Sequence, residues 1–189
     1  MRFLPSMHLI LNQWGVLMEK ETMNTKQKSN MMNRQLYSKR NLWSGILFGV
    51  GLIAFFDEVV FHQLLHWHHF YDLSTTSMGL ISDGLFHAFS WFATIAGLFM
   101  FADLRRRNAL WFTRWWGGVF LGAGVFQLYD GIIQHKLMGI HQIRYVENVI
   151  VYDVVWNIFA LAIIIVGIIL INRTQNHKTT GSTVTNDHV

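Results

Sequence analysis

The sequence predicts an all-α fold: an integral membrane four-helix bundle built from two parallel helical-hairpin repeats. Three observations lead to this prediction. The chain has 189 residues, of which 52% are hydrophobic and only 14% charged, whereas soluble domains carry about 25% charged residues. Four apolar segments each approach the ~20 residues that a helix needs to cross a bilayer. Polar residues of the first two segments recur at matching positions in the last two.

Residues 1–41 form a polar, basic leader that we expect to be flexible. Its short apolar stretch, residues 7–18, is interrupted by Asn12 and Gln13 and is shorter than the ~20 residues that span a bilayer. No small-residue cleavage site follows it, so it does not resemble a signal peptide. An interfacial helix is the alternative.

The four predicted spans cover residues 42–65, 84–102, 115–138 and 149–171, and together they make a transmembrane domain of residues 42–171. Unbroken apolar segments of this length indicate helices, because a helix satisfies its own backbone hydrogen bonds in lipid. The single proline, Pro5, lies outside all four spans. Gly45 and Gly49 in the first span, and Gly118 and Gly122 in the third, have the small-residue spacing that allows close helix contact.

The distribution of lysine and arginine predicts the orientation. These residues gather in the leader, in the connection between the second and third spans and after the fourth span, whereas residues 66–83 have none. The positive-inside rule then predicts a multi-pass protein of the cell membrane, with both termini in the cytoplasm. The polar tail, residues 172–189, is expected to be disordered. Because the formal charge of +4 comes from residues that flank the spans, we expect the lipid bilayer and no nucleic acid as a partner; a homo-oligomer or a membrane protein partner stays open.

A weak internal repeat falls on the polar residues. Asp57, His62 and His68 recur 73 positions later as Asp130, His135 and His141, and Asp83 and His87 recur 70 positions later as Asp153 and Asn157. The first span therefore matches the third, the second matches the fourth, and both halves share one orientation. A pseudo-twofold axis along the membrane normal would bring the two polar sets together, as in other parallel repeats.

This polar zone predicts a metal site near the outer face of the bilayer, because ionisable groups inside a membrane are usually functional. The chain has no cysteine, so its ligands must be nitrogen and oxygen atoms, which suit zinc, iron or copper without deciding between them. The candidate metal ligands are His62, His66, His68, Asp83, His87, His135 and His141, and the candidate catalytic residues are Asp57 and Asp130.

Simpler explanations exist for single residues. His66, His68 and His141 lie near the water boundary, where solvated histidines are common. Asp57 and Asp130 can be structural residues that join helices by hydrogen bonds. Other positions fit the same site: Glu58, His62, His66 and His69 fall on one helical stripe, and Asp83 can either ligate a metal or orient the His87 imidazole.

Three strings resemble a known family: FDEVVFHQLLHWHH (56–69), DGLFHA (83–88) and YDGIIQHKLMGIHQIR (129–144). They are similar to the bacterial predicted membrane proteins grouped as domain of unknown function 2243, over about residues 42–171. The resemblance implies four spans and matches the histidines of the family pattern at His62, His68, His69, His87, His135 and His141. The chain departs from the family pattern at Lys136 and Gln142, where the resemblance implies histidine. The family has no assigned activity, so it supports the architecture more than the function.

The leading functional hypothesis is a metal-binding membrane protein, and whether it is an enzyme stays open. As an enzyme it would hydrolyse a lipid-like substrate or carry out redox chemistry at iron or copper. In hydrolysis the metal would lower the pKa of a bound water, and Asp57 or Asp130 would act as general base. The alternatives are a b-type haem protein with axial His62 and His135, a metal-handling or assembly factor without turnover, and a purely structural bundle.

Overall fold

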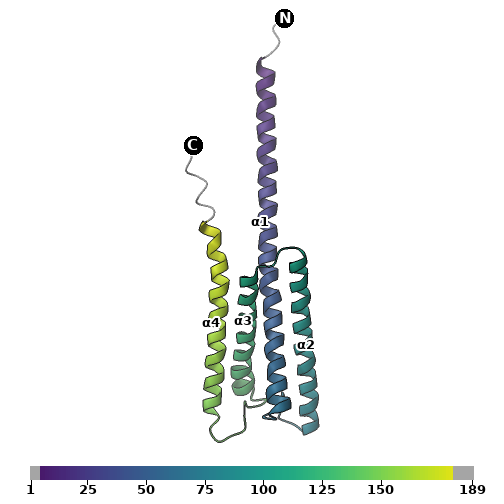
Figure 1. Ribbon diagram of the computed structural model, residues 1–189, viewed down its shortest axis with the longest axis vertical. Coiled ribbons are helices and arrows are strands. Elements are labelled where there is room, and N and C mark those ends of the chain that lie inside the picture. The colour runs from purple at the N-terminus through teal and green to yellow at the C-terminus, as the bar shows by residue number, and fades with distance from the viewer. Residues whose placement is uncertain (1–4, 181–189) are drawn as a thin grey trace. The chain divides into compact units, whose positions relative to one another are not determined.

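The computed structural model describes the backbone of residues 5–180 and the side chains of residues 12–174, and over this range it is all-helical (Figure 1). Helix α1 (Pro5–Asp57) continues into a π-helical segment, η1 (Glu58–Leu64), and helix α3 (Phe112–Tyr129) continues into a second one, η2 (Asp130–Met138). The other two helices are α2 (Thr76–Arg106) and α4 (Ile150–Thr180). The chain divides into two units, residues 1–38 and residues 39–189, which we describe separately.

The first unit is helical from Pro5 onward, where the sequence predicts a flexible leader. After Gly15 this part contains neither glycine nor proline and is rich in methionine, lysine, glutamine and glutamate, which are good helix formers. Side chains of residues 12–36 are all exposed. Helical structure therefore agrees with local propensity, while the predicted flexibility of the leader stays a prediction.

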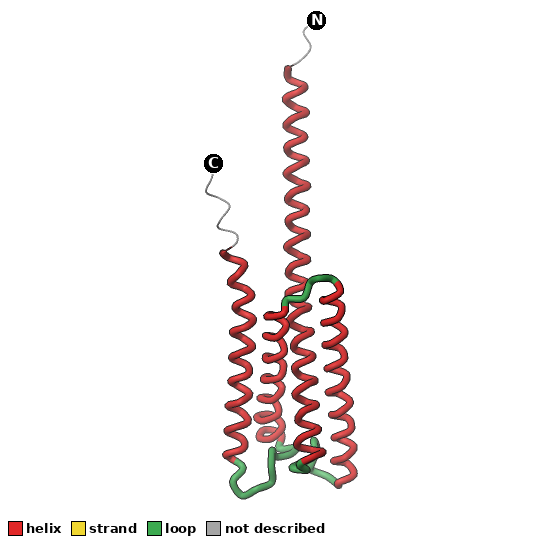
Figure 2. Tube along the Cα trace, viewed as in Figure 1, coloured by secondary structure: helices red, strands yellow, loops and turns green. Residues whose placement is uncertain are grey.

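In the second unit the helices lie side by side (Figure 2). The connections from η1 to α2 and from η2 to α4 lie at one end, and the α2–α3 connection lies at the other. Residues 172–180 extend α4, where the sequence predicts a disordered tail; the rest of that tail, residues 181–189, lies outside the described residues.

Three of the helices are long and apolar enough to cross a membrane: Asn12–Leu64, Thr76–Arg106 and Ile150–Thr174. The third predicted span, which the structure forms as α3 and η2, is not among them. Its composition explains this, because α3 has four glycines and buries polar residues such as Arg114 and Gln127. A helix that packs largely against protein needs less apolar surface than one that faces lipid.

Glycines allow the backbones of α1 and α3 to touch. A Cβ atom added to Gly45 or Gly49 would collide with the carbonyl oxygens of Trp115 and Val119. In the same way, a Cβ atom on Gly118 or Gly122 would collide with the carbonyl oxygens of Leu42 and Ile46. The two glycine pairs thus form the close helix contact that their spacing predicts.

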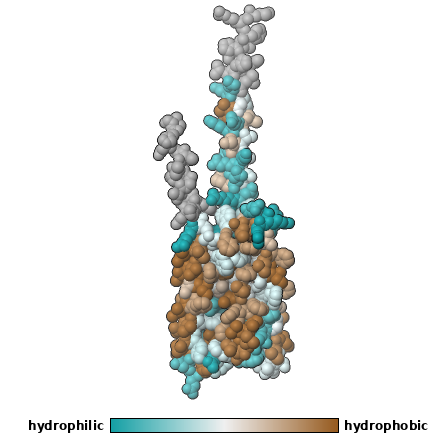
Figure 3. All heavy atoms as spheres, viewed as in Figure 1, coloured by the Kyte–Doolittle hydropathy of each residue, from teal (hydrophilic) through white to brown (hydrophobic). Residues whose placement is uncertain are grey.

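Apolar side chains cover much of the outside of the four helices (Figure 3). Phe92 and Phe99 on α2 are each 74% exposed, and Val155 and Ile158 on α4 are 63% and 62% exposed. So large an apolar surface is unusual for a soluble monomer and is suited to lipid. The cell membrane as the location and the cytoplasmic side for both termini stay predictions.

Local backbone features recur 73 residues apart. The Trp67 amide donates to the Phe61 carbonyl at 2.9 Å, and the Ile140 amide donates to the Gln134 carbonyl at 3.1 Å. Each of these bonds closes a π-helical segment, η1 or η2. In each case the residue just before the donor has a left-handed backbone: His66 (φ 49°) before Trp67, and Gly139 (φ 59°) before Ile140. The two spans therefore end in the same way.

Candidate metal centre

The transitions from α1 to η1 and from α3 to η2 place one aspartate and one histidine of each half on the same side. Backbone hydrogen bonds of a π-helix join residues five apart, and five positions separate Asp57 from His62 and Asp130 from His135. The His62 Nε2 atom lies 3.7 Å from Asp57 Oδ2, and the His135 Nε2 atom lies 3.0 Å from Asp130 Oδ2. Segments of this type are often found at functional sites.

Four imidazoles meet between η1, η2 and the connections that follow them. His62, His135 and His141 are each 1% exposed, and His68 is 6% exposed. The rings of His68 and His141 stack with centroids 4.6 Å apart and planes 3° from parallel. His62 lies edge-on to His68 at 4.6 Å, and His135 lies edge-on to His141 at 4.7 Å. The four rings form one compact cluster.

Hydrogen bonds to the backbone fix two of these imidazoles. His68 Nδ1 donates to the Ile143 carbonyl at 3.0 Å, and His141 Nδ1 donates to the Phe70 carbonyl at 2.9 Å. Since a carbonyl can only accept, Nδ1 of each ring carries a proton, which leaves Nε2 as the atom that can coordinate a metal. Such bonds on the far nitrogen typically hold a histidine in the orientation that binds a metal.

Two carboxylates orient the His62 ring in the same way. Its Nδ1 lies 2.8 Å from Glu58 Oε2 and 3.2 Å from Asp83 Oδ1. The Nε2 atoms of all four imidazoles are buried and make no hydrogen bond of regular geometry among the described residues, although those of His135 and His141 lie 3.0 and 3.4 Å from the carboxylate oxygens of Asp130. These Nε2 atoms are the ones available to bind an ion.

Three groups of side chains have ligand atoms close enough to share an ion. They are His68, His135 and His141; Asp57, His62 and His68; and Glu58, His62 and Asp83. Within each group the ligand atoms lie within 4.8 Å of one another, a spacing near that of atoms bound to one ion at about 2.0–2.2 Å. The first two groups share His68, so they form one continuous centre.

His68 lies in the connection after η1, outside the spanning segments. Burial, and after it the neighbouring imidazoles of His62, His141 and His135, lower the pKa of His68 from 6.5 to about 2. The ring is therefore neutral at physiological pH. Neutral imidazole is the form that binds metals.

Two of the candidate ligands lie outside this cluster. His66 is exposed and occupies the left-handed position after η1. His87 is half-buried, and its Nε2 accepts a hydrogen bond from Trp91 Nε1 at 3.1 Å. The face that α2 buries beside the centre carries Asp83 and Phe86 instead, and the Phe86 ring lies 5.7 Å from that of His62. Because α2 turns Asp83 and Phe86 toward the cluster, His87 lies to one side of it.

Asp83 lies at the centre, but it orients other histidines than His87. Its Oδ2 lies 2.7 Å from His69 Nδ1, and its Oδ1 accepts the Phe70 amide at 2.7 Å. Glu58 and His69 fall on the predicted helical stripe with His62 and are not among the candidate ligands. In the structure both adjoin the centre, Glu58 through His62 and His69 through Asp83.

One comparison identifies a family. The model of a family described as "Predicted membrane protein (DUF2243)" matches residues 44–174, more than half of the chain. No curated protein and no solved structure matches the sequence. The match covers η1, η2 and every residue of the histidine cluster.

Proposed function

We propose that this chain, which belongs to the DUF2243 family of predicted membrane proteins, is a membrane metalloprotein that holds a divalent transition metal in the histidine cluster. The ligands would come from His62, His68, His135 and His141, with Asp57 and Asp130. The observation that carries the proposal is the set of four buried Nε2 atoms, none with a hydrogen bond of regular geometry, that converge with the carboxylates of Asp57 and Asp130. A buried polar atom left unpaired costs about 1–3 kcal/mol, so a bound cation would relieve a large penalty.

We also propose that the two halves are repeats related by a pseudo-twofold axis through this cluster. Contacts on one side of it have counterparts 73 residues later: the His68–Ile143 bond corresponds to the His141–Phe70 bond. The His62–His68 ring pair likewise corresponds to the His135–His141 pair. The ion would then bind on or beside the axis, with equivalent ligands from each half.

Nitrogen and oxygen ligands fit zinc, iron or copper. A bare cation is better supported than haem, because the stacked rings of His68 and His141 pack directly against His62 and His135, the axial ligands of the haem alternative. With both termini in the cytoplasm, the centre would lie near the outer face of the cell membrane. An enzymatic role, hydrolytic or redox, is supported by Asp57, which borders both the cluster and an apolar cavity.

Elemental analysis of the detergent-purified protein, together with its visible spectrum, tests the proposal. We expect zinc, iron or copper at one or more equivalents per chain and no Soret band. A metal-free protein that also fails to bind added Zn²⁺, Fe²⁺ or Cu²⁺ would contradict the metal centre. A Soret band with stoichiometric iron would instead establish the haem alternative.

A further inference from the structure

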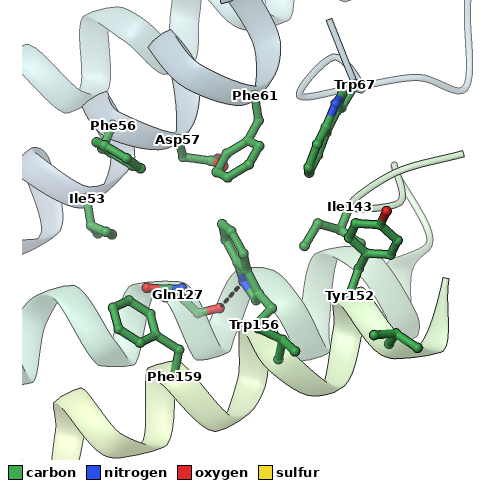
Figure 4. Close-up of a pocket in the computed structure, with 12 residues that line it drawn as sticks. Ile53, Phe56, Asp57, Phe61, Trp67, Gln127, Ile143, Tyr152, Trp156 and Phe159 are labelled. Carbon is green, nitrogen blue, oxygen red and sulfur yellow. Dashed lines mark hydrogen bonds between the residues drawn. The ribbon is translucent and has the colours of Figure 1, made fainter. Parts of the chain in front are cut away.

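An apolar cavity of about 570 Å³ lies beside the histidine cluster, between α1 and η1 on one side and α3 and α4 on the other (Figure 4). Its volume falls in the range of about 300–1,000 Å³ that is typical of small-molecule sites. The lining residues run from Ile53 to Phe61 on α1 and η1, and from Val151 to Phe159 on α4. At ~1.5 Å per residue, the cavity extends roughly 12 Å along the helices.

Half of the residues that line the cavity are aromatic: Phe56, Phe61, Trp67, Tyr152, Trp156 and Phe159. Ring contacts link four of them. The Phe61 ring lies 5.1 Å from that of Trp67 and 5.4 Å from that of Trp156, and the Trp67 ring lies 5.8 Å from that of Tyr152. Aromatic walls favour stacking and edge contacts with a flat ring, which a simple acyl chain does not offer.

Two polar side chains interrupt the apolar wall, and each has an oxygen without a partner. Asp57 is 5% exposed and Gln127 is 4% exposed, and Asp57 Oδ1 and Gln127 Oε1 are buried with no hydrogen bond among the described residues. The backbone carbonyl of Gln127 accepts the Trp156 indole N–H at 3.1 Å, as the dashed line in Figure 4 shows. The side-chain oxygen of an amide can only accept, so the missing partner of Gln127 Oε1 is a hydrogen-bond donor such as a hydroxyl.

The surroundings of the cavity indicate that its ligand comes from lipid. Arg144 lies at the aqueous end, where its guanidinium carbon is 4.8 Å from the centre of the Trp67 ring and its Nη1 donates to the Tyr152 hydroxyl at 2.7 Å. The sides toward the bilayer carry Phe56, Val155 and Phe159, which are 54%, 63% and 55% exposed. The contacts of Arg144 with Trp67 and Tyr152 thus join the residues at the polar end of the cavity, whereas the apolar residues along its side are exposed.

We propose that the cavity binds a lipophilic molecule from the bilayer that has a flat ring and a hydroxyl donor, the chemistry of a membrane quinol. The ring lies among the aromatic side chains, and the hydroxyl donates to Gln127 Oε1. This goes beyond the proposed metal centre, with which the cavity shares only Asp57.

The test uses purified full-length protein in detergent, with decylubiquinol as the probe under anaerobic, reducing conditions. Retained probe is extracted after a desalting column and quantified by absorbance. We expect saturable binding of decylubiquinol. Decylubiquinone, which has carbonyl acceptors in place of hydroxyls, should bind at least tenfold more weakly, and dodecanol, which has a hydroxyl but no ring, should not compete at equal concentration.

Val155→Phe fills the cavity and should weaken decylubiquinol binding at least tenfold. Val154→Phe is the matched control: Val154 is also exposed, at 49%, but does not line the cavity, so the control should bind like the wild type. If Val155→Phe does not fold, Val151→Phe on the same wall replaces it. Absence of saturable binding, equal binding by the filled variant, equal affinity for the quinone, or full competition by dodecanol would each overturn the proposal.

Metal content measured on the same samples separates the two proposals. Protein that binds the quinol but no metal would contradict the metal centre and leave the cavity proposal standing. Protein that contains metal but does not bind the quinol would contradict the cavity proposal and leave the metal centre standing.

Discussion

The two halves of the histidine cluster share their ring contacts and hydrogen bonds to the backbone and differ in the residues around them. His68 and His141 make matching hydrogen bonds to backbone carbonyls. In the first half, Glu58 and Asp83 both approach His62 Nδ1. In the second half, His135 Nδ1 has no hydrogen-bond partner among the described residues.

The difference follows from individual residues. Glycine, Gly131, stands 73 positions after Glu58, and a Cβ there would collide with the side chains of Trp156 and Asn157. Asp153, the counterpart of Asp83, pairs with Lys136 Nζ at 2.5 Å. Lys136 thus replaces the histidine implied by the family resemblance with a cation that neutralises the second-half carboxylate. The atoms that face the cluster are alike, while the supporting residues have diverged.

The strongest test of this likeness is removal of one stacked imidazole from each half. We expect His68→Ala and His141→Ala to lower metal affinity to similar extents, each by more than the 10–100-fold typical of losing a supporting residue. Competition with a chromophoric chelator measures the affinity, and circular dichroism checks the fold. Loss of metal in only one of the two variants would break the proposed equivalence of the halves.

The next effect concerns the residues that differ. Glu58→Gln should weaken metal binding by about 10–100-fold, because the Glu58 carboxylate holds the His62 ring. Lys136→Met should change affinity by less than about tenfold, since the Lys136 side chain is 42% exposed and lies away from the cluster. The same chelator competition measures both variants. Equal losses in the two would show that the second half depends on Lys136 as the first depends on Glu58.

Helix packing gives a comparison that does not involve the metal. Gly49→Leu and Gly122→Leu should each destabilise the protein by about 1–3 kcal/mol or more, because the new side chains meet backbone of the facing helix. Gly84→Ala is the control, since no atom lies within 4 Å of its added Cβ, and it should not destabilise. Thermal unfolding in detergent measures all three; a stable Gly122→Leu protein would contradict the close contact of α1 and α3.

Acid should weaken the metal-free fold through His68. The pKa of His68 is lowered to about 2 in the folded state by burial, while in the unfolded chain it is about 6.5. Between these values the unfolded state binds the extra proton, so the free energy of unfolding falls as pH decreases below about 6.5. Denaturant titrations of metal-free protein from pH 7.5 to 4.5 measure the slope, which His68→Gln should reduce. An unchanged slope would mean that other groups cause it.

The smallest expected effect lies at the position where His66 corresponds to Gly139. A non-glycine residue in the left-handed region is strained by about 1 kcal/mol, so His66→Gly should raise stability by up to that amount. Metal content should stay unchanged, because His66 is exposed and outside the cluster. Elemental analysis and thermal unfolding check both points, and a loss of metal would return His66 to the ligand set.

The sequence predicted much of this arrangement because charged groups are so rare in its apolar segments. The depth of Asp57 and Asp130 and their repeat with the histidines were sufficient to predict that the two sets would meet. The helical stripe that joined His62 to His66 assumed regular α-helical geometry. The structure instead has a wider π-helical turn that ends at Leu64, so His66 leaves the stripe.

Other features depended on packing that no periodicity reveals. His87 shares the four-residue spacing with Asp83, but Phe86 occupies the buried position of α2 beside His62. The sequence placed the start of this span at residue 84, whereas α2 begins at Thr76, after Thr75, whose side chain accepts the Met78 amide at 3.4 Å. That polar first part of the helix holds Asp83 in place.

X-ray absorption spectroscopy at the metal edge of the purified protein tests the central claim most directly. The account predicts only nitrogen and oxygen neighbours at about 2.0–2.2 Å, with the multiple scattering of several imidazoles, and fewer imidazoles in the His68→Ala/His141→Ala double variant. A spectrum without imidazole scattering, or one that the double variant leaves unchanged, would contradict it.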